Sequence, residues 1–271
     1  AIPAVRADTI NDQHVFFIDS QYDALGRSQI TATLRGISDR AYFYVTDDYW
    51  QSLSTADRVK LEELILIFGS EFDRKIYPTE TAFFGSEPNP GIDSNSHITF
   101  VLANLRSNVG GYFDSTHEYS QSQISNSNER EMFFINTAQF ANTQQLFPFI
   151  AHEFQHLISF HQKENLRQVS DDIWLNELRS EYAPTLLGYN MPYEGSNLER
   201  RAQSFLHQPS DSVTEWKNLL PDYGQVALLG GYMAEHWSAR AIGDTLATSA
   251  ISIQSINEAL LRNSYQETFY E

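Results

Sequence analysis

The sequence predicts an α+β protein, with strands concentrated in its first half and helices in its second. Three observations predict this class: short runs of β-branched and aromatic residues before residue 137, long apolar helical patterns after residue 145, and a hydrophobic content of 41%, enough for a normal core. The 271 residues contain no internal repeat, so we expect one large domain or two modest ones.

Six short segments have the composition of strands, because β-branched and aromatic side chains suit a pleated, partly buried surface. They are residues 14–18, 29–35, 41–46, 97–102, 110–113 and 131–136. Residues 120–128 are rich in Ser and Asn and are expected to form an exposed loop before the last strand.

Helical patterns separate and follow these strands. Ser54 can cap a long helix that is expected to run from residue 55 to about residue 76. Its apolar residues recur at helical spacing: Val59, Leu61, Leu64, Ile65 and Phe68. Further helices are predicted around residues 146–158, after Asp172, across residues 226–236 and, from an aromatic pattern, at residues 265–270.

The strongest functional signal is the H-E-x-x-H pattern at residues 152–156, which lies inside an apolar helical stretch. On a helix, His152 and His156 are one turn apart and point the same way, so their two neutral imidazoles can bind one Zn2+. Glu153 follows the first histidine and can act as general base on a metal-bound water. The sequence therefore predicts a zinc centre on this helix.

Catalytic zinc usually takes a third protein ligand, and Glu177 is the candidate. Its distance from His156 along the chain leaves room for the first helix to end, for a loop over residues 163–172, and for a second helix that returns beside the first. Asp171 and Asp172 can cap that second helix.

Residues close to Glu177 in the sequence add to the predicted zinc site. Glu181, one turn later on the same face, can accept the other ring N–H of a ligating histidine and fix its orientation. Residues 174–177 are Trp-Leu-Asn-Glu. Together with H-E-x-x-H, this motif resembles the gluzincin metallopeptidases, among them the thermolysin-like and aminopeptidase N-like enzymes, and most closely the hyicolysin-like bacterial metallopeptidases. The resemblance implies a supporting place beside the metal ligands for Asn176 and Glu181.

The same resemblance implies a zincin-like fold: a mixed sheet ahead of the zinc helix, a mostly helical half after it, and an active cleft between the halves. We therefore divide the chain into two parts. Residues 1–162 form the mixed-sheet part, which includes the zinc helix, and residues 163–271 form the mostly helical part, which carries the third zinc ligand.

Other metallopeptidase classes fit less well. The metzincin pattern requires Gly and His where this chain has Ser159 and Gln162, and His161 falls off the ligand face, as an ordinary surface or loop histidine. The Gly-x-Met-Glu-Asn segment with which aminopeptidases bind a free amino terminus is not found, which favours an endopeptidase. An exopeptidase with the same metal core and an inactive zincin scaffold used for binding or adhesion remain the alternatives.

Gluzincins also use a Tyr or His from the downstream half to stabilise the developing oxyanion. Tyr223 opens a downstream helix at the place where the hyicolysin-like family shows Tyr-Gly, so it is the first candidate. Tyr232 and His236 are the alternatives, and both could equally line the core.

Gly110, Gly111 and Tyr112 form a candidate substrate-binding segment. An edge strand there would let a substrate add as an extra strand through main-chain hydrogen bonds. A simple Gly-Gly turn is the alternative.

Asp93, Asn95 and Asp114 are candidate ligands of a structural Ca2+ ion. An ordinary turn is the favoured interpretation, because Ca2+ takes six or more oxygen ligands and the sequence does not supply them.

The amino-acid composition narrows the kinds of partner that the protein is expected to bind. The net charge of −17 argues against binding to nucleic acid or to anionic membrane surfaces, and no apolar run approaches the length of a membrane helix. The absence of Cys excludes disulfides and thiolate ligands. The chain begins Ala1-Ile2-Pro3 without Met or a signal-like segment, so we expect a processed N terminus.

The predicted protein is a secreted bacterial zinc endopeptidase that acts as a monomer on proteins or peptides. Three side chains, those of His152, His156 and Glu177, are expected to hold Zn2+. Glu153 is expected to take the proton of the attacking water, and Tyr223 to stabilise the oxyanion.

Overall fold

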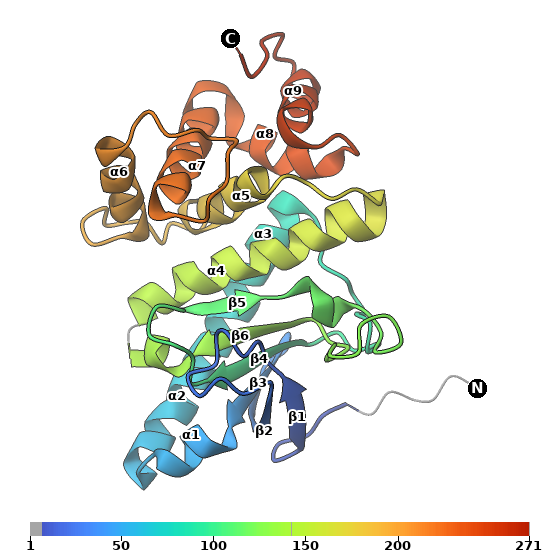
Figure 1. Ribbon diagram of the computed structural model, residues 1–271, viewed down its shortest axis with the longest axis vertical. Coiled ribbons are helices and arrows are strands. Elements are labelled where there is room, and N and C mark those ends of the chain that lie inside the picture. Colours follow the sequence, from blue (N-terminus) through green and yellow to red (C-terminus); the bar gives the residue numbers. More distant parts are fainter. Residues whose placement is uncertain (1–6, 142, 271) are drawn as a thin grey trace. The chain divides into compact units, whose positions relative to one another are not determined.

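The chain forms two compact units in the computed structural model, which describes residues 7–141 and 143–270 (Figure 1). The first unit comprises the residues up to Tyr77 and Pro88–Leu146, and the second comprises Pro78–Glu87 and the chain from Phe147 onward. The mixed sheet and the helices confirm the predicted α+β class.

Two sequence-based expectations are not tested by this architecture. The division after residue 162 and the cleft between the halves remain predictions. Residues 1–3, on which the expected processing of the N terminus rests, lie outside the described residues.

The first unit contains one six-stranded mixed sheet in the order β1-β2-β3-β4-β6-β5. The strands are β1 (Gln13–Phe17), β2 (Gln29–Ile37), β3 (Ala41–Thr46), β4 (Ile98–Ala103), β5 (Gly111–Phe113) and β6 (Met132–Asn136). The β3–β4 and β4–β6 pairs are parallel, and the other pairs are antiparallel. All six predicted strands are therefore confirmed, with ends that shift by one or two residues.

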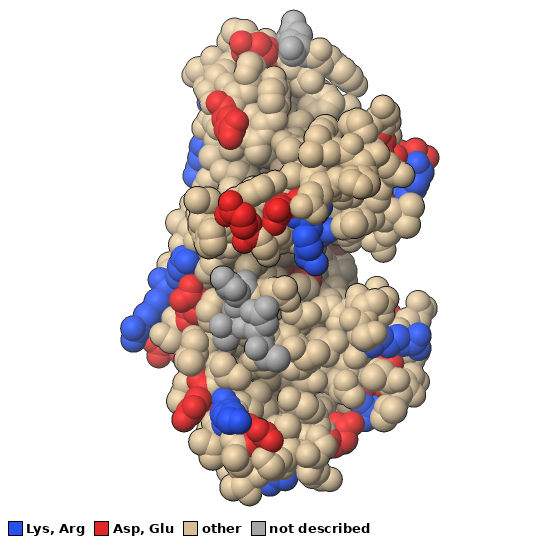
Figure 2. Space-filling view, turned by 90° about the vertical axis from the view of Figure 1, so that its left-hand side faces the viewer, with Lys and Arg blue, Asp and Glu red and all other residues tan. Residues whose placement is uncertain are grey.

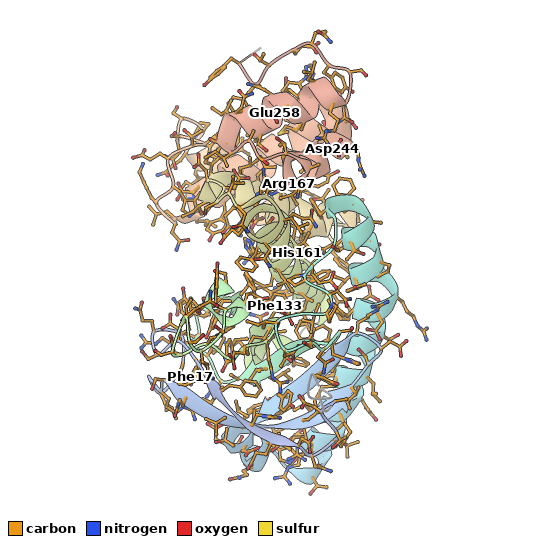
Figure 3. All side chains as sticks on the ribbon, turned by 90° about the vertical axis from the view of Figure 1, so that its right-hand side faces the viewer. Phe17, Phe133, His161, Arg167, Asp244 and Glu258 are labelled. Carbon is orange, nitrogen blue, oxygen red and sulfur yellow. The ribbon has the colours of Figure 1, made fainter. Side chains whose placement is uncertain are left out.

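Both faces of this sheet are covered by apolar side chains, because every residue of β3, β4 and β6 is buried. On one face, helix α2 (Thr55–Glu71) sets Phe68 at 4.9 Å, ring to ring, from both Phe43 and Phe100. Phe100 in turn stacks on Phe133 of β6. Phe133 is labelled in Figure 3. The opposite face is covered by a second cluster that includes Phe16, Tyr44, Val101 and Phe134.

The long helix predicted after Ser54 is present, and the Ser54 side chain caps it by accepting a hydrogen bond from the Asp57 N–H. It continues through a π-helical turn at Phe72–Ile76, as far as the sequence predicts. The expectation for Val59 is wrong: this side chain is half exposed, because the buried face of the helix is made by Leu61, Ile65 and Phe68.

Helices make up the second unit almost entirely. They are α3 (Tyr77–Phe84), α4 (Thr143–Phe160), α5 (Ile173–Leu186), α6 (Asn197–His207), α7 (Leu220–Met233), α8 (Ala239–Asp244) and α9 (Ser252–Arg262). A short helix, α1 (Asp47–Ser52), precedes α2 in the first unit, and π-helical turns extend α4 at His161–Asn165 and α7 at Ala234–Ser238. His161 thus lies at the end of α4 (Figure 3).

Helices α6 and α7 pack with their backbones close together because Gly224 has no side chain. A Cβ at this position would lie 2.9 Å from the Arg201 carbonyl oxygen and 2.9 Å from the Phe205 nitrogen, closer than real Cβ contacts. Any larger residue would therefore push the two helices apart. The close packing at this glycine lets side chains of α6 contact α5 and α7.

Two local predictions in this unit are wrong. Residues 163–172 are not simply a loop, because α4 continues through its π-helical turn and Lys163 is buried there. The Lys163 ammonium is satisfied by the carbonyl oxygens of Thr248 and Ala250 and by the Ser255 hydroxyl, so the chain can bury this charge without ending the helix.

The aromatic pattern at residues 265–270 is not helical, since the last helix of the described residues ends at Arg262. Phe269 packs near the buried Trp174, with ring centroids 6.2 Å apart. Packing against α5 explains the aromatic residues there. From the sequence pattern alone, such packing cannot be distinguished from a helix.

The surface agrees with the acidic composition. Acidic and basic side chains lie in small separate groups over the face shown in Figure 2. Within the part of the chain that the structure describes, no helix combines the length and apolarity needed to cross a membrane.

Candidate metal centre

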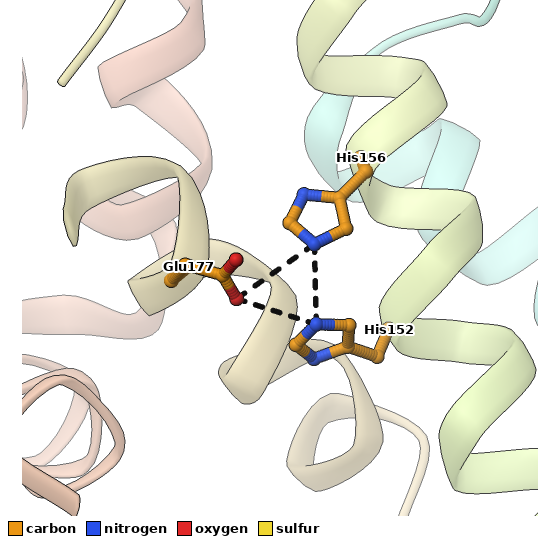
Figure 4. A group of neighbouring side chains, drawn as sticks. All are labelled: His152, His156 and Glu177. Carbon is orange, nitrogen blue, oxygen red and sulfur yellow. Dashed lines mark hydrogen bonds and ion pairs between the residues drawn. The ribbon is translucent and has the colours of Figure 1, made fainter. Parts of the chain in front are cut away.

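Helix α4 brings the two histidines of the motif together. His152 and His156 are one helical turn apart, and their Nε2 atoms lie 3.1 Å from each other (Figure 4). Both side chains are mostly buried, at 15% and 14% exposure. Their apolar neighbours on α4, among them Phe154 and Leu157, anchor the helix in the core and leave the two imidazoles on the other side.

Helix α5 adds Glu177 to this pair. Its Oε2 atom lies 3.3 Å from His152 Nε2 and 3.7 Å from His156 Nε2 (Figure 4). Among the described residues, these three are the group of His, Asp and Glu side chains whose ligand atoms all lie within 4.8 Å of one another.

The three distances fit a tetrahedral zinc ion. Bonds of about 2.0–2.1 Å at tetrahedral angles place neighbouring ligand atoms about 3.3 Å apart, and the observed separations are 3.1, 3.3 and 3.7 Å. The Glu177 Oε2 atom is also buried without a hydrogen-bond partner among the described residues. Such an atom is costly to bury, and a cation bound between the three groups would satisfy it.

The outer nitrogen of His156 is held by a neutral network. The Ser180 hydroxyl lies 3.1 Å from His156 Nδ1 and donates its hydrogen to an acceptor, either Gln155 Oε1 at 2.7 Å or the Asn176 carbonyl at 3.2 Å. With its hydrogen used there, the Ser180 oxygen accepts from the imidazole. Hence His156 carries its proton on Nδ1, and the Nε2 lone pair faces the centre.

Asn176 gives this histidine a second, longer contact. Its side-chain oxygen lies 3.4 Å from His156 Nδ1. The supporting residue predicted beside Glu177 thus lies behind His156 rather than behind His152.

The outer nitrogen of His152 faces a charged group instead. Glu181 Oε1 lies 3.6 Å from His152 Nδ1, an ion-pair distance rather than a hydrogen bond. The carboxylate itself is clamped from α6. Arg201 donates to both of its oxygens, at 2.6 and 3.0 Å, and Asn197 donates to Oε2 at 3.1 Å.

The electrostatics of this centre favour a positive charge between the ligands. Burial alone would lower the pKa of the His152 imidazole. Three neighbouring carboxylates, those of Glu177, Glu181 and Glu153, outweigh burial and raise this pKa to about 9. Burial would likewise raise the pKa of Glu177, yet the two histidines and Arg201 hold it below its usual value. A bound proton or a metal ion would each satisfy this preference.

Glu153 lies beside the centre without joining the three ligand groups. It is buried on α4, at 8% exposure, and its charge contributes to the raised pKa of both His152 and Tyr223. A general base must be close to the metal-bound water without being a ligand, and this role of Glu153 stays a prediction.

Tyr223 lies in the first turn of α7, where its ring is held from two sides. The Arg201 guanidinium lies 4.5 Å over the ring, and Trp216 meets it edge-on at 4.9 Å. Its hydroxyl donates to Asn218 Oδ1 at 2.9 Å. Burial, and after it the negative charge of Glu177, raises the pKa of the Tyr223 phenol.

The two alternatives to Tyr223 occupy another part of the second unit. Tyr232 and His236 are both exposed and stack on each other with ring centroids 5.0 Å apart. Tyr232 lies two and a half turns after Tyr223 on α7, so it projects from the opposite side of the helix.

The predicted substrate-binding segment is an edge strand, not a simple turn. β5 contains Gly111 and Tyr112 and follows Gly110. Among the described residues it pairs with β6 alone, so it is the edge strand of the sheet. The Tyr112 side chain is buried and stacks on Phe134. With Gly111 lacking a side chain and Tyr112 buried, a substrate could meet the backbone at these two residues, and this role stays a prediction.

The candidate calcium residues make the hydrogen bonds of ordinary turns. Asp93 accepts from the Asn95 N–H, Asn95 accepts from the His97 N–H, and Asp114 accepts from the Thr116 N–H. These three contacts agree with the favoured turn interpretation.

Three side chains of the centre were not predicted from the sequence: Ser180, Asn197 and Arg201. The last two lie on α6, a helix that was also not predicted. One signal for it was present, since Ser196 and Glu199 have the spacing of a capping box, and Ser196 does accept from the Glu199 N–H. Ser180 belongs to the Trp-Leu-Asn-Glu-x-x-Ser-Glu stretch that carries the family resemblance, but its contact with His156 was not predicted, because the two residues are distant in sequence.

Comparison with known proteins supports a relation to metallopeptidases. No model of a protein family matches the chain. Over 200 residues, the chain is 26% identical to the neutral metalloprotease ShpI of Staphylococcus hyicus. The match covers 68% of this chain but 39% of that protein, so this chain spans well under half of the relative's length.

Proposed function

We propose that this chain is a zinc-dependent endopeptidase of gluzincin type. One observation carries the proposal: His152 Nε2, His156 Nε2 and Glu177 Oε2 converge at the separations of tetrahedral zinc ligands, and Glu153 lies beside them. The similarity to a protein named neutral metalloprotease supports the same class of reaction. Secretion from a bacterium and action on proteins or peptides are part of the proposal.

In the proposed reaction, a bound zinc ion would supply a Lewis acid and lower the pKa of an attacking water. Glu153 takes the proton from that water and passes it to the amine that leaves. Tyr223 donates a hydrogen bond to the oxygen of the peptide carbonyl as negative charge develops there. This step requires the Tyr223 hydroxyl to turn away from Asn218, its present acceptor.

The remaining residues keep the ligands in place. The hydroxyl of Ser180 accepts from His156, which leaves the Nε2 lone pair for the metal. Glu181 faces the Nδ1 side of His152 at an ion-pair distance of 3.6 Å. The two helices α4 and α5 supply all three ligands, and both are rigid elements with buried apolar faces.

Zinc content and proteolysis, measured on the same preparation, test the proposal. We expect one zinc ion per chain, cleavage of casein, and loss of cleavage on adding a chelator that zinc reverses. A peptide blocked at both ends distinguishes the type of peptidase. An endopeptidase cleaves it, an aminopeptidase cleaves only substrates with a free amino terminus, and an inactive scaffold binds zinc but cleaves neither. Absence of zinc binding would refute the proposal altogether.

A further inference from the structure

We infer that Arg201 is a positioning residue that holds two parts of the proposed centre at once: the Glu181 carboxylate behind His152, and the ring of Tyr223. The inference rests on the proposed zinc function, and it adds a residue of α6 that neither motif of the sequence contains. Arg201 is neither one of the three proposed ligands nor the proposed base. Its side-chain contacts are with Glu181 and Tyr223, and its charge also helps to lower the pKa of Glu177.

The contact with Glu181 has the geometry of a clamp. Arg201 uses Nε and one terminal nitrogen to meet both carboxylate oxygens, at 3.0 and 2.6 Å. Asn197, one helical turn earlier, adds a third donor at 3.1 Å. A two-pronged pair restricts rotation of the carboxylate. Glu181, whose side chain is 2% exposed, is thereby kept facing His152 Nδ1.

The same guanidinium also packs against the ring of Tyr223. Its Cζ atom lies 4.5 Å from the centre of the phenol ring, and Trp216 meets the same ring edge-on. Stacking of this kind depends on a planar cation, which Lys does not provide. Arg201 therefore fixes the ring from which the phenol must reach the substrate.

Gly224 makes this double contact possible. It follows Tyr223 on α7, and a Cβ there would collide with the Arg201 carbonyl oxygen at 2.9 Å. The tight approach of α6 lets one side chain reach Glu181 on α5 and Tyr223 on α7 together.

The experiment separates the two effects by their readouts. Arg201→Met removes the guanidinium and keeps an apolar stem. Through Glu181, it should weaken zinc binding about 10-fold, measured by competition with a chromogenic chelator. Through Tyr223, it should lower kcat about 10-fold at saturating zinc, with KM of a blocked peptide nearly unchanged.

Double variants identify the intermediaries. The zinc effect of Arg201→Met should disappear in a Glu181→Ala background, and its kcat effect should disappear in a Tyr223→Phe background, because the residue through which it acts is already lost. Additive losses in both backgrounds would overturn the inference, as would a parent-like zinc affinity of Arg201→Met.

Controls address folding and charge. Arg240 forms an ion pair with Asp244 on α8, at 3.1 Å, so Arg240→Met removes an equal charge outside the centre and should leave both readouts unchanged. If thermal unfolding shows that Arg201→Met is not folded, Arg201→Lys takes its place. It keeps the charge, loses the planar fork, and should still lower both values; parent-like values for Arg201→Lys would then overturn the inference. A parent protein that binds no zinc would instead overturn the proposed function.

Discussion

The two histidines of the proposed centre are held in different ways. His156 is held by uncharged groups, with the Ser180 hydroxyl at 3.1 Å from its outer nitrogen and Asn176 behind it. His152 is held by the Glu181 carboxylate at 3.6 Å, which is itself clamped by Arg201. One helix thus presents two similar ligands, one supported by local neutral bonds and the other by a charge network that reaches into α6.

The difference predicts unequal sensitivity to substitution. A charge-assisted contact is stronger than a neutral one, but it depends on every member of its network. The neutral support of His156 comes from residues of α4 and α5 alone, next to the ligands themselves. The support of His152 also requires α6 to be in place. We therefore expect zinc affinity to fall more when a residue that supports His152 is changed than when a residue that supports His156 is changed.

The largest effect is expected from the proposed general base, Glu153, which is not among the groups that support His152 or His156. Glu153→Gln keeps size and removes proton transfer, so hydrolysis should fall at least about 100-fold while zinc content stays at the parent level. Metal analysis and casein cleavage check both parts. Activity within about tenfold of the parent would show that Glu153 has another role, and loss of zinc would make it a ligand.

The next effect ranks the two carboxylates of α5. Glu177→Ala removes a proposed ligand and should weaken zinc binding far more than Glu181→Ala, for which we expect a loss of about 10–100-fold. Competition with a chromogenic chelator measures both. If Glu181→Ala proved to be the weaker zinc binder, the roles of ligand and support would have to be exchanged.

A smaller effect tests the neutral side of the comparison. Ser180→Ala removes one uncharged hydrogen bond to His156, worth about 1 kcal/mol, so zinc affinity should fall about fivefold. Ser159→Ala is the control, because Ser159 bonds to the far end of the Gln155 amide and does not touch His156. A loss for Ser180→Ala as large as that for Glu181→Ala would contradict the proposed difference between the two histidines.

This contrast also shows which parts of the centre the sequence could predict. His152 and His156 lie one turn apart on one helix, so helical periodicity alone brings them to one side. Glu177 lies on a second helix, and its place was predicted from the Trp-Leu-Asn-Glu motif and its distance along the chain. The sheet was predictable as well, since each strand is a local run of β-branched and aromatic residues. In both cases the information lies within a few consecutive residues.

The residues that were missed depend on contacts between helices. Arg201 reaches Glu181 because Gly224 lets α6 approach α7, and no local pattern contains that information. Lys163 was expected in a surface loop, yet carbonyl oxygens of Thr248 and Ala250 make its burial possible. Charged residues were therefore the hardest to place, because their partners decide whether they are buried.

The last comparison concerns stability instead of zinc binding, and it sets Glu181 against Glu80, another buried carboxyl of the second unit. Glu181 accepts three hydrogen bonds from α6, whereas both side-chain oxygens of Glu80 are buried without a hydrogen-bond partner among the described residues. Burial alone holds the pKa of Glu80 well above its usual value. The folded protein therefore binds this proton more tightly than the unfolded chain does.

The sign of the effect on stability follows from this difference. The contribution of Glu80 is fully present below the pKa of the unfolded chain and is lost as pH rises toward the folded pKa, by at most about 1.4 kcal/mol per pH unit. Glu80→Gln cannot ionise, so its free energy of unfolding relative to the parent should rise between pH 5 and pH 8. Urea unfolding at several pH values, with exposed Glu194→Gln as the control, measures it. If the Glu80→Gln and parent curves remain parallel over this range while the control also stays parallel, a partner must stabilise the Glu80 carboxylate, and its contrast with Glu181 would no longer hold.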